Sequence, residues 1–209
     1  MALPMPPFFK RKTDRVPRMG EPSSLPTISS QRLALCWIDH ADVAGIYEIY
    51  SDNKMGRHAP FSHQDDAHIY IESIHQGFND GKLFQWGICL QGSQKIIGTC
   101  TLNDISPDQG SAGVGYAIAG PYKGQGYGSE AMAALIGYAF GELGLRRLEA
   151  DVDPHNVKCL KSLEALGFRR EGYLRQRWLV AGELQDSVIL GLLKSDCMPE
   201  AKQVPMSRN

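Results

Sequence analysis

The stretch from Pro121 to Ala131 places three glycines at alternate positions directly before a run with helical spacing. Glycine lets the main chain turn sharply and lets a ligand approach the amide groups closely. The start of a helix adds several unpaired N–H groups and a partial positive charge. Together these features predict a loop and helix start that bind a phosphate or pyrophosphate group.

The same stretch also fits a second kind of phosphate site. Gly126, Gly128 and Ala131 match the dinucleotide fingerprint, and Glu149 lies at about the right distance beyond them. Residues 121–123 separate the preceding strand from the loop, however, and too few residues follow Glu149 to complete that fold. A Walker loop is excluded because no Gly-Lys-Ser/Thr follows. NAD binding without coenzyme A binding would favour the dinucleotide alternative.

The hydrophobic periodicity predicts a single α/β (α+β) domain with one mixed, mostly antiparallel sheet of about seven strands and about four helices. Crossover helices link the later strands, so the sheet should be antiparallel first and partly parallel after. The expected strands span residues 31–38, 83–90, 95–102, 112–118, 147–152, 168–180 and 184–193. The expected helices span residues 39–51, 65–78, 128–143 and 157–166, with Asp39 and Asp42 starting the first and Gly144 and Gly167 ending the last two.

Length and composition suit one globular domain, because the chain has 209 residues and 43% of them are hydrophobic. We expect this domain at 29–195, between a flexible, proline-rich basic arm (1–28) and a polar tail (196–209). The formal net charge of −1 does not indicate a nucleic-acid binder. The arm lacks the apolar segment of a signal peptide, and no apolar run could span a bilayer. We therefore expect a cytoplasmic monomer or homodimer without membrane contact.

The cysteines and histidines give no pattern of a metal site. The five cysteines are scattered without a Cys-x-x-Cys pair, which is typical of a reducing compartment. The histidines lack zinc spacing; His68 and His75 share one face of a predicted helix, which a solvated face explains. We expect no metal ion.

Two segments resemble the signatures of the GNAT (Gcn5-related N-acetyltransferase) superfamily. Residues 123–128, Lys-Gly-Gln-Gly-Tyr-Gly, are similar to its pyrophosphate loop, with Lys where Arg or Gln is commoner. Residues 156–168 are similar to its second signature, an Asn, two residues, a Ser and a helix ending Leu-Gly-Phe. Arg32-Leu33, Gly115-Tyr116 and the 182–186 hairpin resemble the RimJ/RimL-like branch, the ribosomal-protein N-terminal acetyltransferases. The resemblance covers residues 31–195.

The resemblance implies acetyl-CoA as the donor and an amine as the acceptor. The pantetheine arm would then lie along the backbone of Tyr116, Ala117 and Ile118. Asn156 would hydrogen-bond that arm, although Asn also suits an ordinary helix cap. The residues expected to contact the pyrophosphate are Lys123, Gly124, Gln125, Gly126, Tyr127, Gly128 and Ser129.

The chemistry requires a neutral amine, so a general base should remove its proton. Many relatives carry Glu where this chain has Gly113, which cannot act as a base. Other relatives place an acid five residues before the Asn, and here that residue is Asp151. Glu149, Asp151 and Asp153 alternate, so they share one face of a strand and would raise one another's pKa. There are two alternatives to Asp151 as the base: the three carboxylates could form only a solvated polar face, or Asp104 could be the base.

The departing thiolate also needs a proton or a hydrogen bond. Leu163 stands where many relatives have Tyr, and Cys159 stands where the RimJ/RimL-like branch has Ser. A thiol donates a hydrogen bond more weakly than a hydroxyl, but Cys159 could still lie beside the coenzyme sulfur. We therefore take Asp151 and Cys159 as the candidate catalytic residues for direct transfer in a ternary complex. Two alternatives remain for Cys159: it could carry the acetyl group covalently, or it could be only a small buried apolar residue without a catalytic role.

The sequence thus predicts an acetyl-CoA-dependent N-acetyltransferase whose acceptor is a protein or peptide N-terminus of the ribosomal-protein type. One alternative is the acetylation of a small-molecule amine, such as a polyamine or an antibiotic. Another is a non-catalytic acyl-CoA sensor, because Gly113 and Leu163 replace two familiar catalytic positions. The basic arm would offer a contact with ribosomal phosphate groups.

Overall fold

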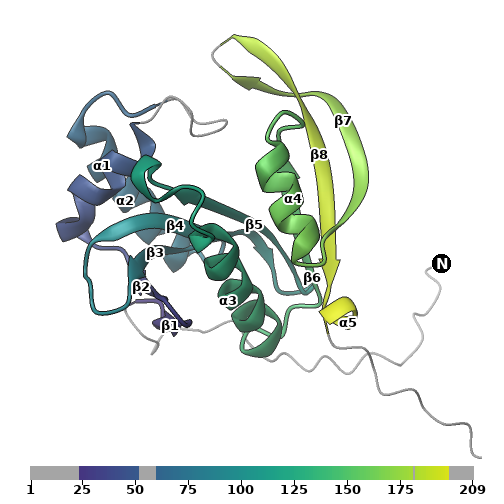
Figure 1. The fold of residues 1–209 in the computed structure, drawn as a ribbon, viewed down its shortest axis with the longest axis horizontal. Helices are drawn as coiled ribbons and strands as arrows, with labels where there is room; N and C mark the ends of the chain where they lie inside the picture. The colour runs from purple at the N-terminus through teal and green to yellow at the C-terminus, as the bar shows by residue number, and fades with distance from the viewer. Residues whose placement is uncertain (1–23, 52–59, 181, 198–209) are drawn as a thin grey trace, which may run out of the picture.

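The computed structural model describes residues 24–51, 60–180 and 182–197. One eight-stranded mixed sheet forms the centre, with the strand order β1-β2-β3-β4-β5-β6-β8-β7 (Figure 1). All neighbouring strands are antiparallel except β5 and β6. The strands are β1 (Ile28–Ser29), β2 (Leu33–Trp37), β3 (Phe84–Leu90), β4 (Ile96–Ser106), β5 (Ser111–Ile118), β6 (Arg147–Val152), β7 (Arg169–Val180) and β8 (Glu183–Leu193).

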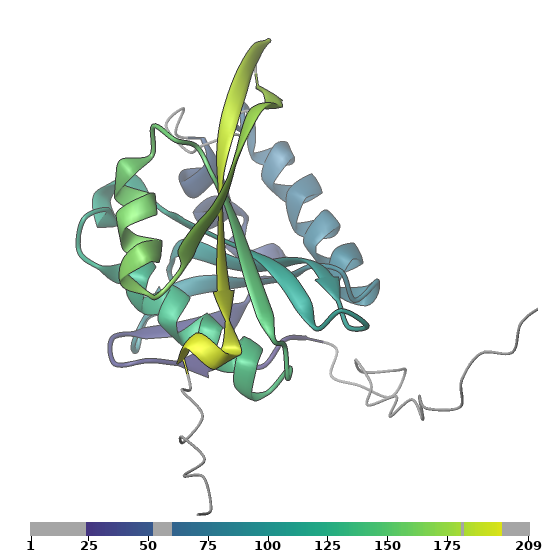
Figure 2. The same cartoon turned by 90° about the vertical axis from the view of Figure 1, so that its right-hand side faces the viewer.

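Helices cover both faces of this sheet, so that α4 and α2 lie on opposite sides of it in Figure 2. Strand β2 shows the alternation that makes this possible, because Leu33 and Leu35 join one core while Cys36 faces the other. The first core includes α3 and α4, and the second includes α1 and α2. The helices are α1 (Val43–Tyr50), α2 (Gln64–Asn79), α3 (Tyr127–Gly141), α4 (Val157–Ala165) and α5 (Lys194–Cys197), with 3-10 turns η1 (His40–Asp42) and η2 (Gly120–Tyr122).

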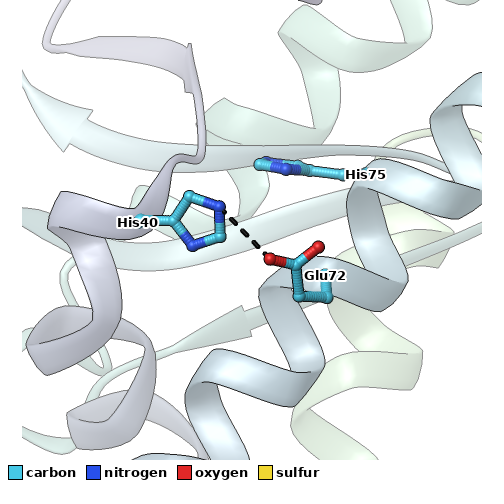
Figure 3. Close-up of side chains that lie close together, drawn as sticks. All are labelled: His40, Glu72 and His75. Atoms are coloured by element: carbon cyan, nitrogen blue, oxygen red, sulfur yellow. Dashed lines mark ion pairs between the residues drawn. The ribbon is translucent and has the colours of Figure 1, made fainter.

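The second core is closed at one edge by contacts of α2 with the end of β2 and with the residues that follow it. The His75 ring stacks on Trp37, with ring centroids 4.7 Å apart. His75 Nε2 lies 2.9 Å from the main-chain oxygen of Ile38. The His40 Nε2 of η1 lies 3.4 Å from the Glu72 Oε1 of α2 (Figure 3). These contacts fix the position of α2 against the end of β2.

The predicted α/β class and the mixed sheet are confirmed, but the element counts differ. The structure has eight strands, because Ile28 and Ser29 pair with Leu35 and Ala34 as an extra edge strand. It has five α-helices, because α5 adds a single turn after β8. The first predicted helix is divided into η1 and α1, although its capping box at Asp39 is present as expected.

Strand β4 extends beyond its predicted end. It runs to Ser106, and its register with β5 shifts between Asn103 and Ser106. Asp104 takes a positive φ of 49° within this irregular segment. Bulges of this kind have no clear signature in a single sequence, because they depend on the partner strand.

The packed part of the chain begins before residue 29, where the sequence placed the domain start. Leu25 is buried in the first core, and the Trp86 indole N–H donates to the Pro26 oxygen over 2.9 Å. Most of the predicted basic arm, residues 1–23, lies outside the described residues, as does the tail from residue 198. None of the helices in the described part of the chain is long and apolar enough to cross a bilayer.

Candidate active site

The two parallel strands at the centre of the sheet pair over only three residues each. Ser111–Gly113 of β5 align with Arg147–Glu149 of β6, and the pairing stops there. Beyond this point β5 continues to Ile118 against β4 alone, and β6 continues to Val152 against β8 alone (Figure 1). Within the described sheet, the edge of Tyr116, Ala117 and Ile118 toward β6 therefore has no strand partner. An extended ligand can hydrogen-bond such an edge as an added strand would.

The glycine loop lies directly after this free edge. Gly124 and Gly126 have φ values of 81° and 80°, a left-handed conformation that other residues adopt only with strain. Gly126 is the N-cap of α3, and because glycine has no side chain, no side chain at the N-cap accepts a hydrogen bond from the first turn. The amides that open α3 therefore have no side-chain cap from Gly126, which leaves this helix start suited to an anion.

Gly128 is required for a different reason, which is space. A Cβ at this position would overlap with the Tyr116 ring on β5. The first turn of α3 can thus pack directly against the strand that forms the free edge. Beside it, Ser129 Oγ lies 2.7 Å from Ser162 Oγ and joins the start of α3 to α4.

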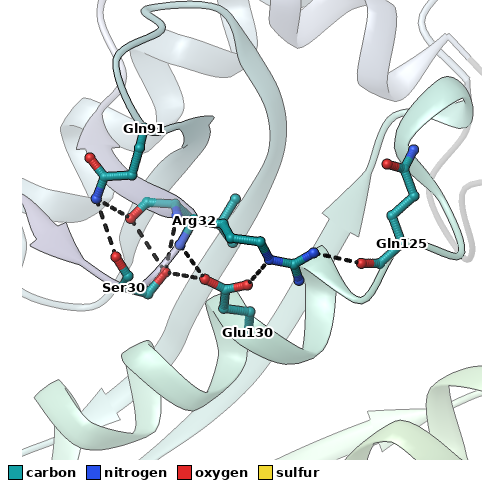
Figure 4. A network of polar contacts seen from close by, with 6 residues as sticks. Ser30, Arg32, Gln91, Gln125 and Glu130 are labelled. Atoms are coloured by element: carbon teal, nitrogen blue, oxygen red, sulfur yellow. Dashed lines mark hydrogen bonds and ion pairs between the residues drawn. The ribbon is translucent and has the colours of Figure 1, made fainter.

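Arg32 holds the glycine loop in place, and the sequence analysis did not assign it this role. Its Nε lies 2.6 Å from Glu130 Oε2, and its Nη1 donates to the Gln125 oxygen over 3.2 Å (Figure 4). The guanidinium also lies over the Tyr127 ring, 4.7 Å from its centroid. Arg32 is the residue directly before β2, almost a hundred positions before the glycine loop. This long-range contact holds the loop in its shape and places a positive charge beside it.

Glu130 is the anchor of this arrangement. Its Oε1 accepts hydrogen bonds from the Arg32 amide over 2.7 Å and from Ser30 Oγ over 2.8 Å. Partial burial acts to raise the pKa of Glu130, but these hydrogen bonds and the Arg32 charge outweigh burial and lower it below its ordinary value. The carboxylate form of Glu130 is therefore the one that the folded protein stabilises.

Asn156 and Cys159 lie at the start of α4, as the second signature predicts. The Asn156 Oδ1 accepts from the Cys159 amide over 3.2 Å, so Asn156 is a helix cap in this structure. Its amide nitrogen belongs to the same exposed side chain and can donate a hydrogen bond to a ligand as well.

The Cys159 thiol is half-buried, and burial raises its pKa, while a hydrogen bond from Tyr116 opposes that rise. The thiol is consequently protonated near neutral pH, which opposes a nucleophilic acetyl-cysteine route.

Tyr116 brings a hydroxyl to this same place. Burial and the neighbouring Cys159 raise its pKa to about 12, and Ser162 is a further hydrogen-bonding partner. The sequence pointed only to the backbone of Tyr116. Its side chain was missed because nothing in a single sequence shows that a strand residue reaches a helix more than forty positions later.

Asp151 lies on β6, two residues past the last pair with β5. Leu148, Ala150 and Val152 point into the first core, so Asp151 points to the opposite face. Its Oδ2 accepts from the Trp178 indole over 3.1 Å, and Arg177 Nε lies 3.9 Å away. The carboxylate therefore lies where the two strands have separated.

The other acidic candidates are placed differently. Glu149 pairs with Arg147 over 2.7 Å, and Asp153 accepts from the His155 amide over 2.8 Å. The expected cluster of three mutually interacting carboxylates is therefore replaced by three carboxylates with separate partners. Asp104 follows Asn103, which is paired with Gly113 at the closed end of the two strands. This position lies away from the free edge.

Gly113 is covered rather than open. A Cβ there would lie 2.8 Å from the Asn103 side-chain oxygen, so a larger residue would displace Asn103. Leu163, the other departure from the family pattern, is buried in the first core. Neither position carries a titratable side chain, so the candidate catalytic groups are those of β6 and of the start of α4.

The β7–β8 hairpin extends past the rest of the domain (Figures 1 and 2). Its Trp178 indole reaches Asp151. Residues 173–177 of β7 line an open hollow of about 670 Å³. Asp186 fixes its shape by accepting from the Tyr173 hydroxyl over 2.5 Å and from the Gln176 amide over 2.7 Å. The hairpin thus presents basic and aromatic side chains next to the Asp151 carboxylate.

Comparison with known proteins identifies the family. A family model described as an acetyltransferase (GNAT) domain matches residues 32–169. The chain is 32% identical to p20, an uncharacterized N-acetyltransferase of Bacillus licheniformis, over 81% of this chain and 97% of that protein. It is 25% identical to the Escherichia coli [ribosomal protein uS5]-alanine N-acetyltransferase, over 86% of this chain and 98% of that one.

A solved structure shows the same fold. Mycobacterium smegmatis RimJ, in complex with CoA-disulfide, superposes with a TM-score of 0.76 at 21% identity, covering 84% of this chain and 91% of that one. The chain therefore belongs to the GNAT acetyltransferase family, with relatives in the RimJ/RimL ribosomal-protein branch. This family transfers an acetyl group from acetyl-CoA, so the dinucleotide alternative is set aside. The free edge of β5 and the glycine loop fit a pantetheine diphosphate group.

Substitution of Gly128 by alanine should weaken coenzyme A binding about tenfold or more, because the new methyl group displaces the Tyr116 ring beneath the loop. Isothermal titration with coenzyme A measures the change. Gly137→Ala on the same helix is the matched control: its Cβ would meet nothing within 4 Å, and the change should preserve binding and slightly stabilise the protein. Equal affinities of the two variants would contradict the packing argument.

Replacing Glu130 by glutamine should destabilise the protein by about 0.5–1 kcal/mol at pH 7, since half-exposed ion pairs contribute little more. Glu130 has a lowered pKa, so its contribution is present above the ordinary value of 4.5 and is lost as the pH falls through the folded value. Urea unfolding of both proteins should therefore show a difference that shrinks as the pH falls below 4.5. The exposed Glu183→Gln is the control, and a difference independent of pH would refute this role.

Proposed function

We propose that this protein acetylates the α-amine at the N-terminus of a protein, with acetyl-CoA as the donor. The observation that carries the proposal is the separation of β5 and β6 after Gly113 and Glu149, directly before the glycine loop. The free strand edge suits the pantetheine arm of the coenzyme, and the uncapped helix start that follows it in the chain suits the diphosphate. Acetyl-CoA supplies an activated acetyl group bound as a thioester.

The residues assigned to the coenzyme are those of the free edge and the loop. The backbone of Tyr116, Ala117 and Ile118 would bind the pantetheine arm, and the amides from Gly124 to Ser129 would bind the diphosphate. Arg32 joins this set, because it holds Gln125 and brings a positive charge to the loop. Lys123 and the Asn156 amide complete the assignment.

Asp151 is our candidate for the general base. It lies on the separated segment of β6, facing away from the α3–α4 core, where an acceptor amine can reach it. The Trp178 indole N–H donates to its Oδ2 over 3.1 Å and so orients the carboxylate. In this role Asp151 accepts the proton that the amine loses as its nitrogen bonds to the acetyl carbon.

Cys159 and Tyr116 are our candidates for the group that supports the departing thiolate. Both have raised pKa values, the first chiefly through burial and the second through burial and Cys159. Both are therefore protonated at neutral pH and can donate a hydrogen bond to sulfur. This arrangement favours direct transfer.

The choice of a protein N-terminus as acceptor rests on the relatives and on the open acceptor side. The Escherichia coli relative is named for an alanine of ribosomal protein uS5. In this chain the hollow along residues 173–177 is open, and Trp178 and Leu179 beside it are exposed. An open surface of this kind can accept an extended peptide, whereas a small amine is usually bound in an enclosed pocket.

Asp151→Asn should lower kcat by about 10²- to 10⁴-fold, the usual contribution of a general base, and leave coenzyme A affinity nearly unchanged. Asparagine keeps an oxygen for the Trp178 indole, so the fold should be preserved. Steady-state kinetics and calorimetry measure the two quantities. Asp104→Asn is the control and should retain activity; a loss of kcat in that variant instead would move the base to the closed end of the strands.

A panel of acceptors tests the proposed substrate class. Peptides that begin with Ala or Ser should be acetylated at the α-amine, and the same peptides with a blocked N-terminus and an internal lysine should not. Thiol release gives the rate, and mass spectrometry locates the acetyl group. Faster turnover of spermidine would favour a small-molecule acceptor. Tight coenzyme binding without turnover of any acceptor would favour a sensor.

A further inference from the structure

We propose that His40, Glu72 and His75 form a zinc-binding site that joins η1 to α2. The three side chains converge at the outer edge of the second core (Figure 3). His40 follows β2 in the chain, whereas Arg32, which contacts the glycine loop at Gln125, precedes it. A five-residue strand separates the two positions by about 16 Å, so the site is distinct from the active site.

The ligand atoms have a spacing that suits a single ion. One ligand atom of each residue lies within 4.8 Å of the other two. His40 Nε2 and Glu72 Oε1 are 3.4 Å apart. Bonds of about 2.0–2.1 Å in a tetrahedral zinc site place neighbouring ligands about 3.3–3.4 Å apart. The distance between His40 and Glu72 therefore already fits a zinc site. Small rotations of these two exposed side chains would shorten their distances to His75.

The third ligand, His75, is held in place by contacts with Ile38 and Trp37. The main-chain oxygen of Ile38 can only accept, so His75 Nε2 carries the proton and donates to it over 2.9 Å. His75 Nδ1 then has the lone pair that a metal requires. Stacking on Trp37, with an interplanar angle of 13°, fixes the plane of the ring. Metal-binding histidines commonly donate their other N–H to such an oxygen.

The elements of the fold bring the donors together. Glu72 and His75 are three residues apart on α2, so they share one face of that helix. His40 belongs to η1, which the Asp39 capping box positions. The histidine rings meet edge to face, with centroids 5.4 Å apart. Because His40 comes from a distant segment, the spacing along the chain gave no signal, and the expectation of no metal was drawn from that spacing.

The donor set selects the ion. Two imidazoles and one carboxylate are typical zinc ligands, and they leave a fourth position for water. Magnesium and calcium prefer oxygen ligands, of which this site offers one residue. His40 and Glu72 are exposed, so an ion can reach the site from solvent. A bound ion would link two segments that enclose the second core and would stabilise the fold by mass action.

Zinc titration of the full chain, first freed of metal by a chelator, tests the proposal in competition with a chromophoric chelator. One zinc ion should bind per chain. His40→Gln and Glu72→Gln should each weaken binding about tenfold or more, since both remove a ligand. His68→Gln is the matched control, because His68 is an exposed histidine of the same helix outside the cluster. Equal affinity in all four proteins would overturn the proposal.

Two further measurements separate this site from the five cysteines, which can also bind zinc. Cobalt(II) at the proposed site should give visible d–d bands without thiolate-to-metal charge transfer, and a strong charge-transfer band would overturn the assignment. Zinc should raise the melting temperature of the wild type and of His68→Gln, but not that of His40→Gln. Magnesium should have no effect on any of them.

Discussion

The separation of two parallel strands organises this molecule. Strands β5 and β6 are held together only from Ser111 to Gly113, because each then follows its antiparallel partner, β4 or β8. The unpaired edge that results must be satisfied by water or by a ligand. The glycine loop and the start of α3 follow this edge in the chain, and Asp151 lies across from it. In our proposal, the donor and acceptor sides of the reaction meet where this sheet divides.

The departures from the family pattern become understandable once the packing is known. Gly113 carries no side chain, and Asn103 fills the space above it. Leu163 is part of the core beneath α4. In our proposal, catalytic groups therefore come from neighbouring positions: a carboxylate from β6 and a hydroxyl and thiol from Tyr116 and Cys159. The fold preserves the place of the reaction while the residues that serve it differ.

The two ends of β2 have separate roles. Arg32, just before the strand, fixes the glycine loop through Glu130 and Gln125. His40, just after it, meets Glu72 of α2 in the proposed zinc site. In our proposals, the first contact supports the coenzyme site and the second joins η1 to α2 on the opposite face of the sheet. Both are contacts between segments distant in the chain, so both depend on the register of β2 in the sheet.

The sequence alone determined the local features of this protein: the glycine loop, the capping box at Asp39, the glycine ends of two helices and the period of seven of the eight strands. These follow from short-range sterics and hydrogen bonds, which residue order records directly. Only the tertiary structure decided that β5 and β6 separate, that Arg32 holds the loop, that Tyr116 reaches Cys159, and that His40 meets Glu72 and His75. Each of these depends on which strands pair and in what register, and that is settled by burial over the whole domain.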